Sequence, residues 1–322
     1  MGNGSNYNLD FEKPLQGLEK RIDEIKAFAE EKQIDMSEEI ARIQEKAVSL
    51  KKEIYNNLTP WQKIQLARHP KRPTLLEYID LVFDGFIELH GDRLFKDDPA
   101  LVGGLAYFDK IPVTILGHQK GRDTKENIYR NFGMPHPEGY RKAIRLMKQA
   151  EKFGRPVISF VDVAGAYPGK EAEERGQGEA VAKSIMEMAK LRVPIVVVVT
   201  GEGGSGGALA IGVGDRVLML EHAYYSVISP EGCASILWKN AADASKAAED
   251  LHLTAKNLLD LGVIDEVIPE PLGGAHRDHE ATAKAIKEAI QNNFTELLKQ
   301  NIEELLTQRY KKFREVARYI EE

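Results

Sequence analysis

The chain has 322 residues, 43% of them hydrophobic and 29% charged, with a formal net charge of −6 and a single cysteine, Cys233. This length and apolar content suit one large domain with attachments, and the acidic balance argues against nucleic acid and anionic membranes as partners. A single cysteine excludes an internal disulfide and a cysteine-based zinc site, and it predicts a cytoplasmic protein. The sequence has no apolar run of about 18 to 20 residues, so no membrane span is expected.

The first expected element is a helical arm. The polar start "MGNGSNYN" is typical of a tag remnant. Between residues 15 and 58 apolar residues recur every three or four positions among Glu and Lys, which predicts two amphipathic helices. Asp35, with Glu38 three residues later, is expected to cap the second helix. We assign residues 1–70 to the tag remnant and this arm, as a packing or oligomer contact, because three prolines indicate a boundary near residue 70.

A unit of strand, loop and helix then repeats with a period of about 40 residues. An apolar, β-branched run opens at each of Pro112, Pro156 and Pro194, and helical segments such as "YRKAIRLMKQAEKF" fill the gaps. This pattern predicts a stacked β/α spiral or another α/β sheet, with strands buried on both faces. We assign residues 71–275 to this domain and residues 276–322, which are helical and charged, to a packing tail.

Two of the predicted strands end in loops that contain glycine, "DVAGAYPG" and "TGEGGSGG". Ligands bind at the carboxyl ends of parallel strands in α/β folds, so both loops are candidate site segments. The second loop fits the dinucleotide pattern G-x-G-x-x-G at Gly201, Gly203 and Gly206, with Glu221 as a ribose ligand. Only "GALAIGVGD" separates this loop from the next apolar run, which is too short for the crossover of a dinucleotide-binding unit.

The same loop also fits the nucleophile pattern G-x-S-x-G, centred on Ser205, with Asp265 and His276 as candidate acid and base. A third interpretation explains more of the sequence. If Gly206 and Gly207 open a short helix, their backbone N–H groups point at whatever lies in the cleft and stabilise negative charge there. The loop "DVAGAYPG" repeats the arrangement one unit earlier, so the two loops are expected to meet.

Long segments of the sequence resemble the carboxyltransferase alpha subunit of bacterial acetyl-CoA carboxylase. The resemblance runs from "LDFEKP" to "PEPLGGAHR" and is carried by "HQKGRDTKENIYRNFGMPHPEGYRKA", "PVISFVDVAGAYPGKEAEERGQGEA", "TGEGGSGGALAIGVGD" and "YSVISPEGCASILW". It implies a crotonase-like β/α spiral, here with an N-terminal helical hairpin and a helical C-terminal tail. It also implies transfer of a carboxyl group from carboxybiotin, held on a separate carrier protein, to acetyl-CoA, which forms malonyl-CoA for fatty acid synthesis.

The resemblance also assigns roles to residues and partners. Gly206 and Gly207 would donate N–H groups to the biotin oxygen. Four further residues would shape the biotin site, namely Gly203, Gly204, Gly165 and Ala166. The family implies an α2β2 assembly with a beta subunit that supplies the acyl-CoA side, together with a biotin carboxyl carrier protein and a biotin carboxylase. No metal is expected in this chain, since its eight histidines show no metal-ligand spacing. On this interpretation Gly207→Val should leave the fold largely intact and cut carboxyl transfer by about 10²- to 10³-fold, as expected for the loss of an oxyanion donor.

Two other functions remain open at this stage. A crotonase-like acyl-CoA hydratase or isomerase would place an acid or base in the cleft, for which Glu202 and Glu231 are candidates. A scaffold subunit would have no chemistry of its own. The cluster of Lys120, Arg122, Lys125 and Arg130 either binds CoA phosphates or stabilises a loop or subunit contact.

Overall fold

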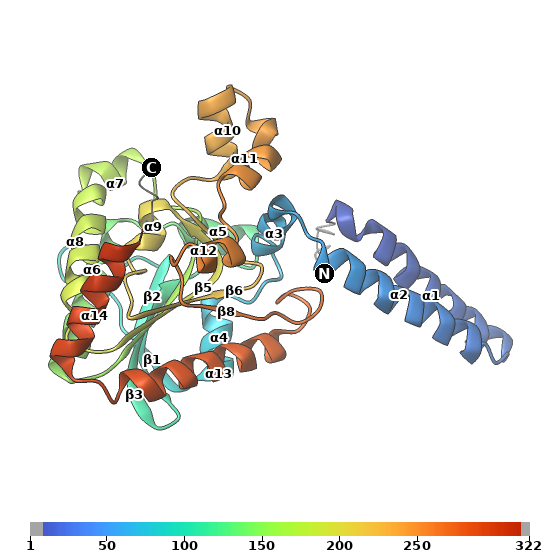
Figure 1. Cartoon of the computed structure of the whole chain (residues 1–322), viewed down its shortest axis with the longest axis horizontal. Helices are drawn as coiled ribbons and strands as arrows, with labels where there is room; N and C mark the ends of the chain where they lie inside the picture. The colour runs from blue at the N-terminus through green and yellow to red at the C-terminus, as the bar shows by residue number, and fades with distance from the viewer. Residues whose placement is uncertain (1–8, 317–322) are drawn as a thin grey trace, which may run out of the picture.

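A mixed sheet of eight strands forms the centre of the protein in the computed structural model, which describes residues 9–316 (Figure 1). The segment interpreted as a tag remnant lies outside these residues. The sheet order is β1 (Asp84–Glu88), β2 (Leu101–Phe108), β3 (Ile111–His118), β4 (Val157–Val163), β5 (Ile195–Gly204), β6 (Arg216–Leu220) and β8 (Glu266–Ile268), and β7 (Tyr224–Ser226) pairs with the end of β5. β1 to β3 are antiparallel, and the pairs from β3 to β8 are parallel.

The three strands predicted after prolines are confirmed as β3, β4 and β5. All ten residues of β5 are buried, as expected for a strand covered on both faces. The β2–β3 hairpin was not predicted. Its two-residue turn, Asp109 and Lys110, has φ angles of 46° and 71°, a conformation that usually selects Asn-Gly or Asp-Gly.

Helices cover both faces of the sheet. α6 (Pro137–Lys152) packs against β2, β3 and α8 (Gln177–Lys190), while α13 (His279–Leu297) packs against β5 and α4 (Leu75–Val82). The other helices of the domain are α3 (Pro60–Ala67), α5 (Thr124–Tyr129), α7 (Lys170–Glu174), α9 (Ser205–Leu209), α10 (Pro230–Trp238), α11 (Ala244–Asp250), α12 (Ala255–Asp260) and α14 (Ile302–Glu315). α10 and α11 contact each other and project from the domain beside α3 (Figure 1).

The predicted arm is a hairpin of α1 (Lys13–Lys32) and α2 (Ser37–Asn56) that extends away from the domain (Figure 1). Leu15, Ile22, Ile43 and Ala47 form its small core. The N-cap position of α2 is Met36 rather than Asp35, although the Asp35 carboxylate accepts the N–H of Ser37 at 2.9 Å. The role of this hairpin as a packing or oligomer contact stays a prediction, as do the boundaries at residues 70 and 275.

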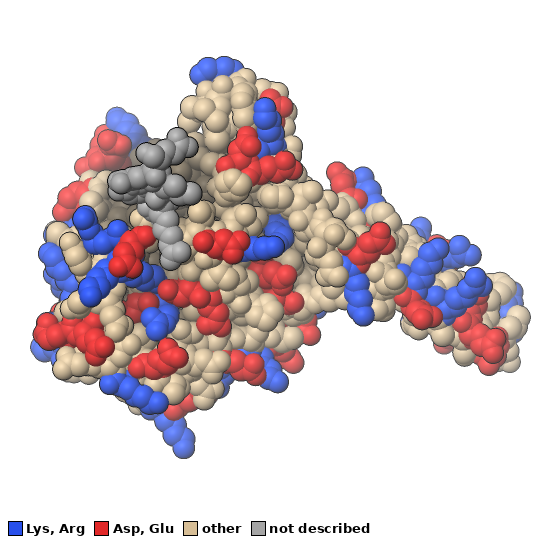
Figure 2. All heavy atoms as spheres, viewed as in Figure 1, with Lys and Arg blue, Asp and Glu red and all other residues tan. Residues whose placement is uncertain are grey.

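Two further observations concern membrane spans and surface charge. No helix among residues 9–316 is long and apolar enough to cross a membrane. Figure 2 shows acidic and basic side chains interspersed over the visible face of the domain and over the hairpin, so this face carries no large field of one sign.

The C-terminal helix α14 is anchored by a buried arginine. Arg309 is 2% exposed, and its guanidinium donates to both carboxylate oxygens of Asp215 at 2.8 Å. It also donates to the carbonyls of Leu191 at 2.7 Å and Val193 at 3.0 Å. The ion pair and the two carbonyls satisfy the buried charge and connect the tail to the segments before β5 and β6.

We therefore expect Arg309→Ala to lower the free energy of unfolding by about 3 to 5 kcal/mol, because Asp215 would be left buried without its cation. Urea unfolding followed by circular dichroism measures this. Arg192→Ala is the matched control, since Arg192 pairs with Glu303 at the surface and such pairs contribute about 0 to 1 kcal/mol. Equal effects of the two substitutions would show that α14 is not anchored by Arg309.

Candidate functional site

The two loops that contain glycine lie against each other at the carboxyl ends of β4 and β5. Val163 pairs with Gly203, so the strands deliver their loops to the same edge of the sheet. A Cβ on Gly204 would collide with the carbonyl oxygen of Ala164, and a Cβ on Gly207 would lie 2.5 Å from the backbone N of Ala166. The expected meeting of the loops is therefore observed, and it depends on bare backbone.

This packing corrects one expectation about Gly207. The sequence suggested that Gly207→Val would leave the fold intact, but any side chain at this position meets the backbone of Gly165 and Ala166. The loop after β4 would have to move. Gly206 differs, because a Cβ there would meet only Val181 Cγ1, at 3.3 Å.

The start of α9 presents unpaired backbone donors. Among the described residues, neither the N–H of Gly206 nor that of Gly207 has a hydrogen-bond acceptor. Gly207 is buried, and a buried unpaired N–H is uncommon enough to require an explanation. Beside these donors lies a hollow of about 260 Å³ whose lining is mainly apolar, namely Ser205, Gly206, Leu209, Tyr225, Ser226, Val227 and Val263.

The geometry does not support a serine nucleophile. Ser205 is exposed and has a φ of 51°, as in a strand-to-helix nucleophile turn. Its candidate partners are engaged elsewhere, however. Asp265 accepts the N–H of Val217 at 2.6 Å and pairs with Lys312, while His276 stacks on His69 with ring centroids 3.9 Å apart.

The dinucleotide pattern lacks its structural context as well. α9 has only five residues, and the chain enters β6 at Arg216 without the crossover helix that a dinucleotide-binding unit requires. The carboxylate of Glu221 accepts the backbone N–H of Glu270 at 3.3 Å.

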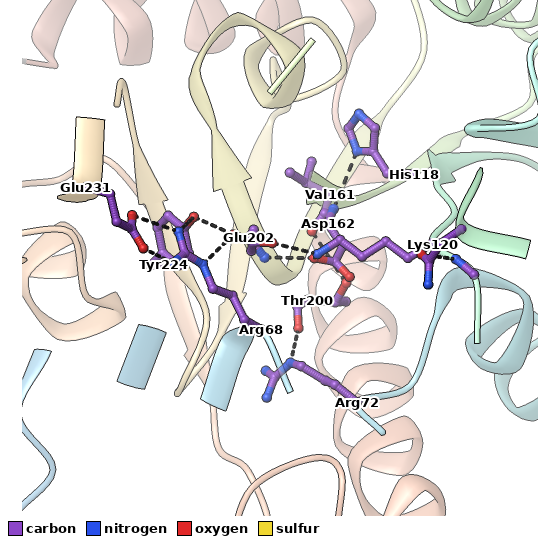
Figure 3. A network of polar contacts seen from close by, with 12 residues as sticks. Arg68, Arg72, His118, Lys120, Val161, Asp162, Thr200, Glu202, Tyr224 and Glu231 are labelled. Carbon is purple, nitrogen blue, oxygen red and sulfur yellow. Dashed lines mark hydrogen bonds and ion pairs between the residues drawn. The ribbon is translucent and has the colours of Figure 1, made fainter. Parts of the chain in front are cut away.

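A network of charged side chains lies below the loops, at the ends of β3, β4 and β5 (Figure 3). Lys120 Nζ is 2.6 Å from Asp162 Oδ1 and 2.9 Å from Glu202 Oε1. Arg68, which follows α3, contacts Glu202 at 2.8 Å and Glu231 on α10 at 2.5 Å. These ion pairs connect five segments that are distant in sequence.

The network holds Glu202 as a carboxylate. Burial by itself raises the pKa of Glu202, but the charges of Lys120 and Arg68 outweigh it and lower the pKa to about 2. The hydroxyl of Tyr224 also donates to Glu202, at 2.7 Å. A carboxylate so stabilised is a poor proton donor at neutral pH, which argues against Glu202 as the acid or base of a hydratase. Glu231 is occupied by Arg68.

The basic cluster from Lys120 to Arg130 is directed mostly inward. Lys120 lies in the network, Arg122 pairs with Glu77 and donates to the carbonyls of Pro70 and Arg72, and Arg130 donates to Pro99 O at 2.9 Å. Lys125 is exposed. These contacts favour the loop-stabilising interpretation for three of the four residues. Among the described residues, no group of three or more His, Cys, Asp or Glu side chains could hold a metal ion.

Sequence reasoning missed several residues of this site, including Arg68, Asp162, Tyr224 and His118. Asp162 is the one charged residue in the mostly apolar run "VISFVDV", and that irregularity at a strand end was a usable signal. Arg68 lies 134 residues before Glu202, and nothing local in the sequence indicates that the two side chains meet.

Residues 8–317 match the family described as acetyl co-enzyme A carboxylase carboxyltransferase-like. A curated relative from Anoxybacillus flavithermus, the acetyl-coenzyme A carboxylase carboxyl transferase subunit alpha, is 58% identical over 98% of this chain and 97% of its own length. The protein of the same name from Heliobacterium modesticaldum is 59% identical over 96% of this chain and 92% of its own length.

Solved structures with a similar fold are more distant in sequence. The transcarboxylase 12S core aligns with a TM-score of 0.59 at 18% identity, over 72% of this chain and 43% of that one. A subunit of a Pseudomonas malonate decarboxylase hetero-tetramer in complex with coenzyme A aligns with a TM-score of 0.55 at 18% identity, over 66% and 85% of the two chains. At this identity the likeness is one of fold.

The network generates a stability prediction. Lys120→Met should lower the free energy of unfolding at pH 7 by about 3 kcal/mol, because Asp162 would lose its lysine partner and Glu202 would keep only Arg68 as a cation. In the wild type the contribution of Glu202 is present above its ordinary pKa of 4.5 and is lost as the pH falls toward about 2. Urea unfolding at pH 7 and at about pH 3 should therefore show a smaller stability difference between the wild type and the variant at the lower pH.

The control for Lys120 is Lys148→Met, since Lys148 is 53% exposed in its pair with Glu187. It should change stability by less than about 1 kcal/mol at both pH values. A Lys120 variant as stable as this control would contradict the inferred role of the network.

Ser205 is predicted not to act as a nucleophile, because Asp265 and His276 are held elsewhere. Incubation with a fluorophosphonate followed by peptide mass spectrometry should find no adduct at Ser205, while a serine hydrolase in the same reaction is labelled. Stoichiometric modification of Ser205 that disappears on prior unfolding would reinstate the nucleophile interpretation.

Proposed function

The chain belongs to the acetyl co-enzyme A carboxylase carboxyltransferase-like family, and from this premise we propose that it supplies the biotin side of a carboxyl-transfer site. Relatives at 58% identity across nearly the whole chain are alpha subunits of the acetyl-coenzyme A carboxylase carboxyl transferase. The chain accordingly acts as a carboxyltransferase alpha subunit, in which a carboxyl group is transferred to acetyl-CoA and malonyl-CoA is formed.

One observation supports the placement of the site above all others. Two adjacent backbone N–H groups, on Gly206 and Gly207, have no acceptor among the described residues and lie at the start of a helix. Preorganised donors of this kind stabilise negative charge as it develops in a transition state, at no cost of reorganisation. Gly206 and Gly207 are thus the proposed oxyanion donors, and Gly203, Gly204, Gly165 and Ala166 shape the approach to them.

The hollow beside the donors fits the ring system of biotin, a compact and largely apolar group with one polar ureido edge. Leu209, Val227 and Val263 offer apolar surface, and Gly206, one of the two donors, is part of the same lining. Bound there, carboxybiotin would supply the carboxyl group, and the ureido oxygen would receive the N–H groups as its charge grows. The chain's own residues bind, orient and stabilise this oxygen, and the charged network below keeps the strand ends in place.

The two competing functions fit the structure less well. A hydratase or isomerase needs a carboxyl group able to exchange a proton, and both candidates are tied into ion pairs. A scaffold without chemistry gives no reason for two unpaired N–H groups beside a hollow. Binding of a biotin analogue that is abolished by a change in the loop would distinguish the proposed role from a scaffold.

The assembly follows from the family. As an alpha subunit the chain works with a beta subunit, and we propose that the two form an α2β2 unit in which the beta subunit binds the acyl-CoA. We further propose that a separate biotin carboxyl carrier protein delivers carboxybiotin to the glycine loop, that a biotin carboxylase charges this carrier, and that the enzyme is cytoplasmic.

The purified chain alone is expected to show no measurable decarboxylation of malonyl-CoA in the presence of free biotin, because half of the site is missing. Addition of the beta subunit should restore turnover, measured as acetyl-CoA formed, and the active species should elute as a complex larger than either chain. A beta subunit mixed with an unrelated acidic protein is the control. Substantial turnover by this chain as a monomer would refute the divided site.

A further inference from the structure

His118 is a buried histidine that the proposed chemistry does not use. It is the last residue of β3 and is 1% exposed. Its Nδ1 accepts the backbone N–H of Asp162 at 3.4 Å, and its ring is turned away from the ion pairs of Lys120 and Glu202 (Figure 3). Its Nε2 is buried and has no hydrogen-bond partner among the described residues. A buried polar atom in this condition requires an explanation.

The imidazole lies next to the backbone of Gly207 and of Phe160. The carbonyl of Gly207 is itself without a partner in the helix. The N–H of Ala210 bonds to Gly206 O at 3.0 Å, and the N–H of Ile211 bonds to Ala208 O at 3.3 Å, so the ladder skips Gly207. The ring of His118, whose Nε2 has no partner in the described part of the chain, therefore lies beside a backbone carbonyl that the helix ladder leaves out, at the first turn of α9.

The protonation state of the ring follows from its surroundings. Burial lowers the pKa of His118 to about 3, with a further contribution from the charge of Lys120. The ring is therefore neutral at physiological pH and carries a single N–H. Because Nδ1 accepts from Asp162, that proton is on Nε2, which is therefore a donor.

We propose that His118 is a positioning residue for the glycine loop, with its Nε2–H directed at the Gly207 carbonyl. The Asp162 amide fixes one side of the ring, and the ring in turn fixes the peptide that follows Gly207. This restricts the rotation of the first turn of α9 and so the direction of the Gly206 and Gly207 N–H groups. This role rests on the proposed oxyanion function of those N–H groups. If they have that function, His118 matters for rate, because a displacement of about 1 Å at such a site lowers the rate by about 100-fold.

The test uses the chain reconstituted with its beta subunit. His118→Leu removes both ring contacts, whereas His118→Gln keeps one acceptor and one donor on a flexible side chain. His222→Leu is the matched control, because His222 is 4% exposed and also has an unpartnered buried Nδ1, but its ring faces Tyr55 of the arm. Decarboxylation of malonyl-CoA with free biotin gives kcat and KM, and amide hydrogen exchange of residues 205–211 reports on the loop itself.

His118→Leu should lower kcat by about 10- to 100-fold, with KM values changed by less than about threefold, and should accelerate amide exchange in residues 205–211. His118→Gln should recover much of both effects. The pH dependence of kcat between pH 6 and pH 9 should be the same in the wild type and the Gln variant, because a neutral positioning group does not titrate there. His222→Leu should keep kcat within about twofold of the wild-type value, even if this variant unfolds more easily than the wild type.

Three outcomes would overturn the proposal. The first is unchanged exchange in residues 205–211 of His118→Leu, and the second is a loss of kcat that the His222 variant shares. The third is the loss of an ionisation from the pH profile, which would make His118 a proton-transfer group. If the wild-type complex itself does not turn over, the proposed function fails, and the exchange measurement still tests His118.

Discussion

The site depends on the contact between two backbone segments that no side chain separates. Residues 164–166 follow β4, and residues 204–207 form the end of β5 and the start of α9. A Cβ on Gly204 or Gly207 would enter the backbone of the loop after β4. These glycines are therefore required for space rather than for unusual dihedral angles. In the stretch from Gly201 to Gly207 the one residue with a positive φ is Ser205. The close contact leaves the N–H groups of Gly206 and Gly207 without acceptors among residues 9–316, at the carboxyl ends of the strands, where ligands bind in this class of fold.

The charged network holds these two backbone segments in contact. Lys120, Asp162 and Glu202 come from the ends of three adjacent parallel strands, and Arg68 connects Glu202 to Glu231 on α10. Ion pairs so shielded from solvent are strong only when every member has a partner, and removal of one leaves a costly charge. The network thus makes the position of the glycine loop dependent on segments far from it in sequence. It also explains why the carboxylates nearest the loop are structural rather than acid–base groups.

Other parts of the molecule stabilise the sheet from its periphery. Arg309 ties α14 to the segments before β5 and β6, and Arg72 pairs with the buried Glu270 at 2.5 Å near the base of the arm. The arm has a small core of its own and is joined to the domain through Glu12, which accepts from Tyr55 and pairs with Arg277. The site is consequently built on packed strands, whereas α1, α2, α10 and α11 project away from the domain (Figure 1).

The sequence alone determined the elements whose signal is local. Prolines and continuous apolar runs located β3 to β5, the helical period located the arm and α6, and the resemblance of "TGEGGSGGALAIGVGD" to one family pointed to Gly206 and Gly207. It did not locate the β2–β3 hairpin, whose turn residues Asp109 and Lys110 adopt positive φ without a glycine. Only the tertiary structure decided which charges meet, because contacts such as Arg68 with Glu202 join residues 134 apart through the packing of strands and helices. The tertiary structure also decided that His118 lies behind the glycine loop, since the parallel pairing of β3 and β4 sets that register and no spacing along the chain encodes it.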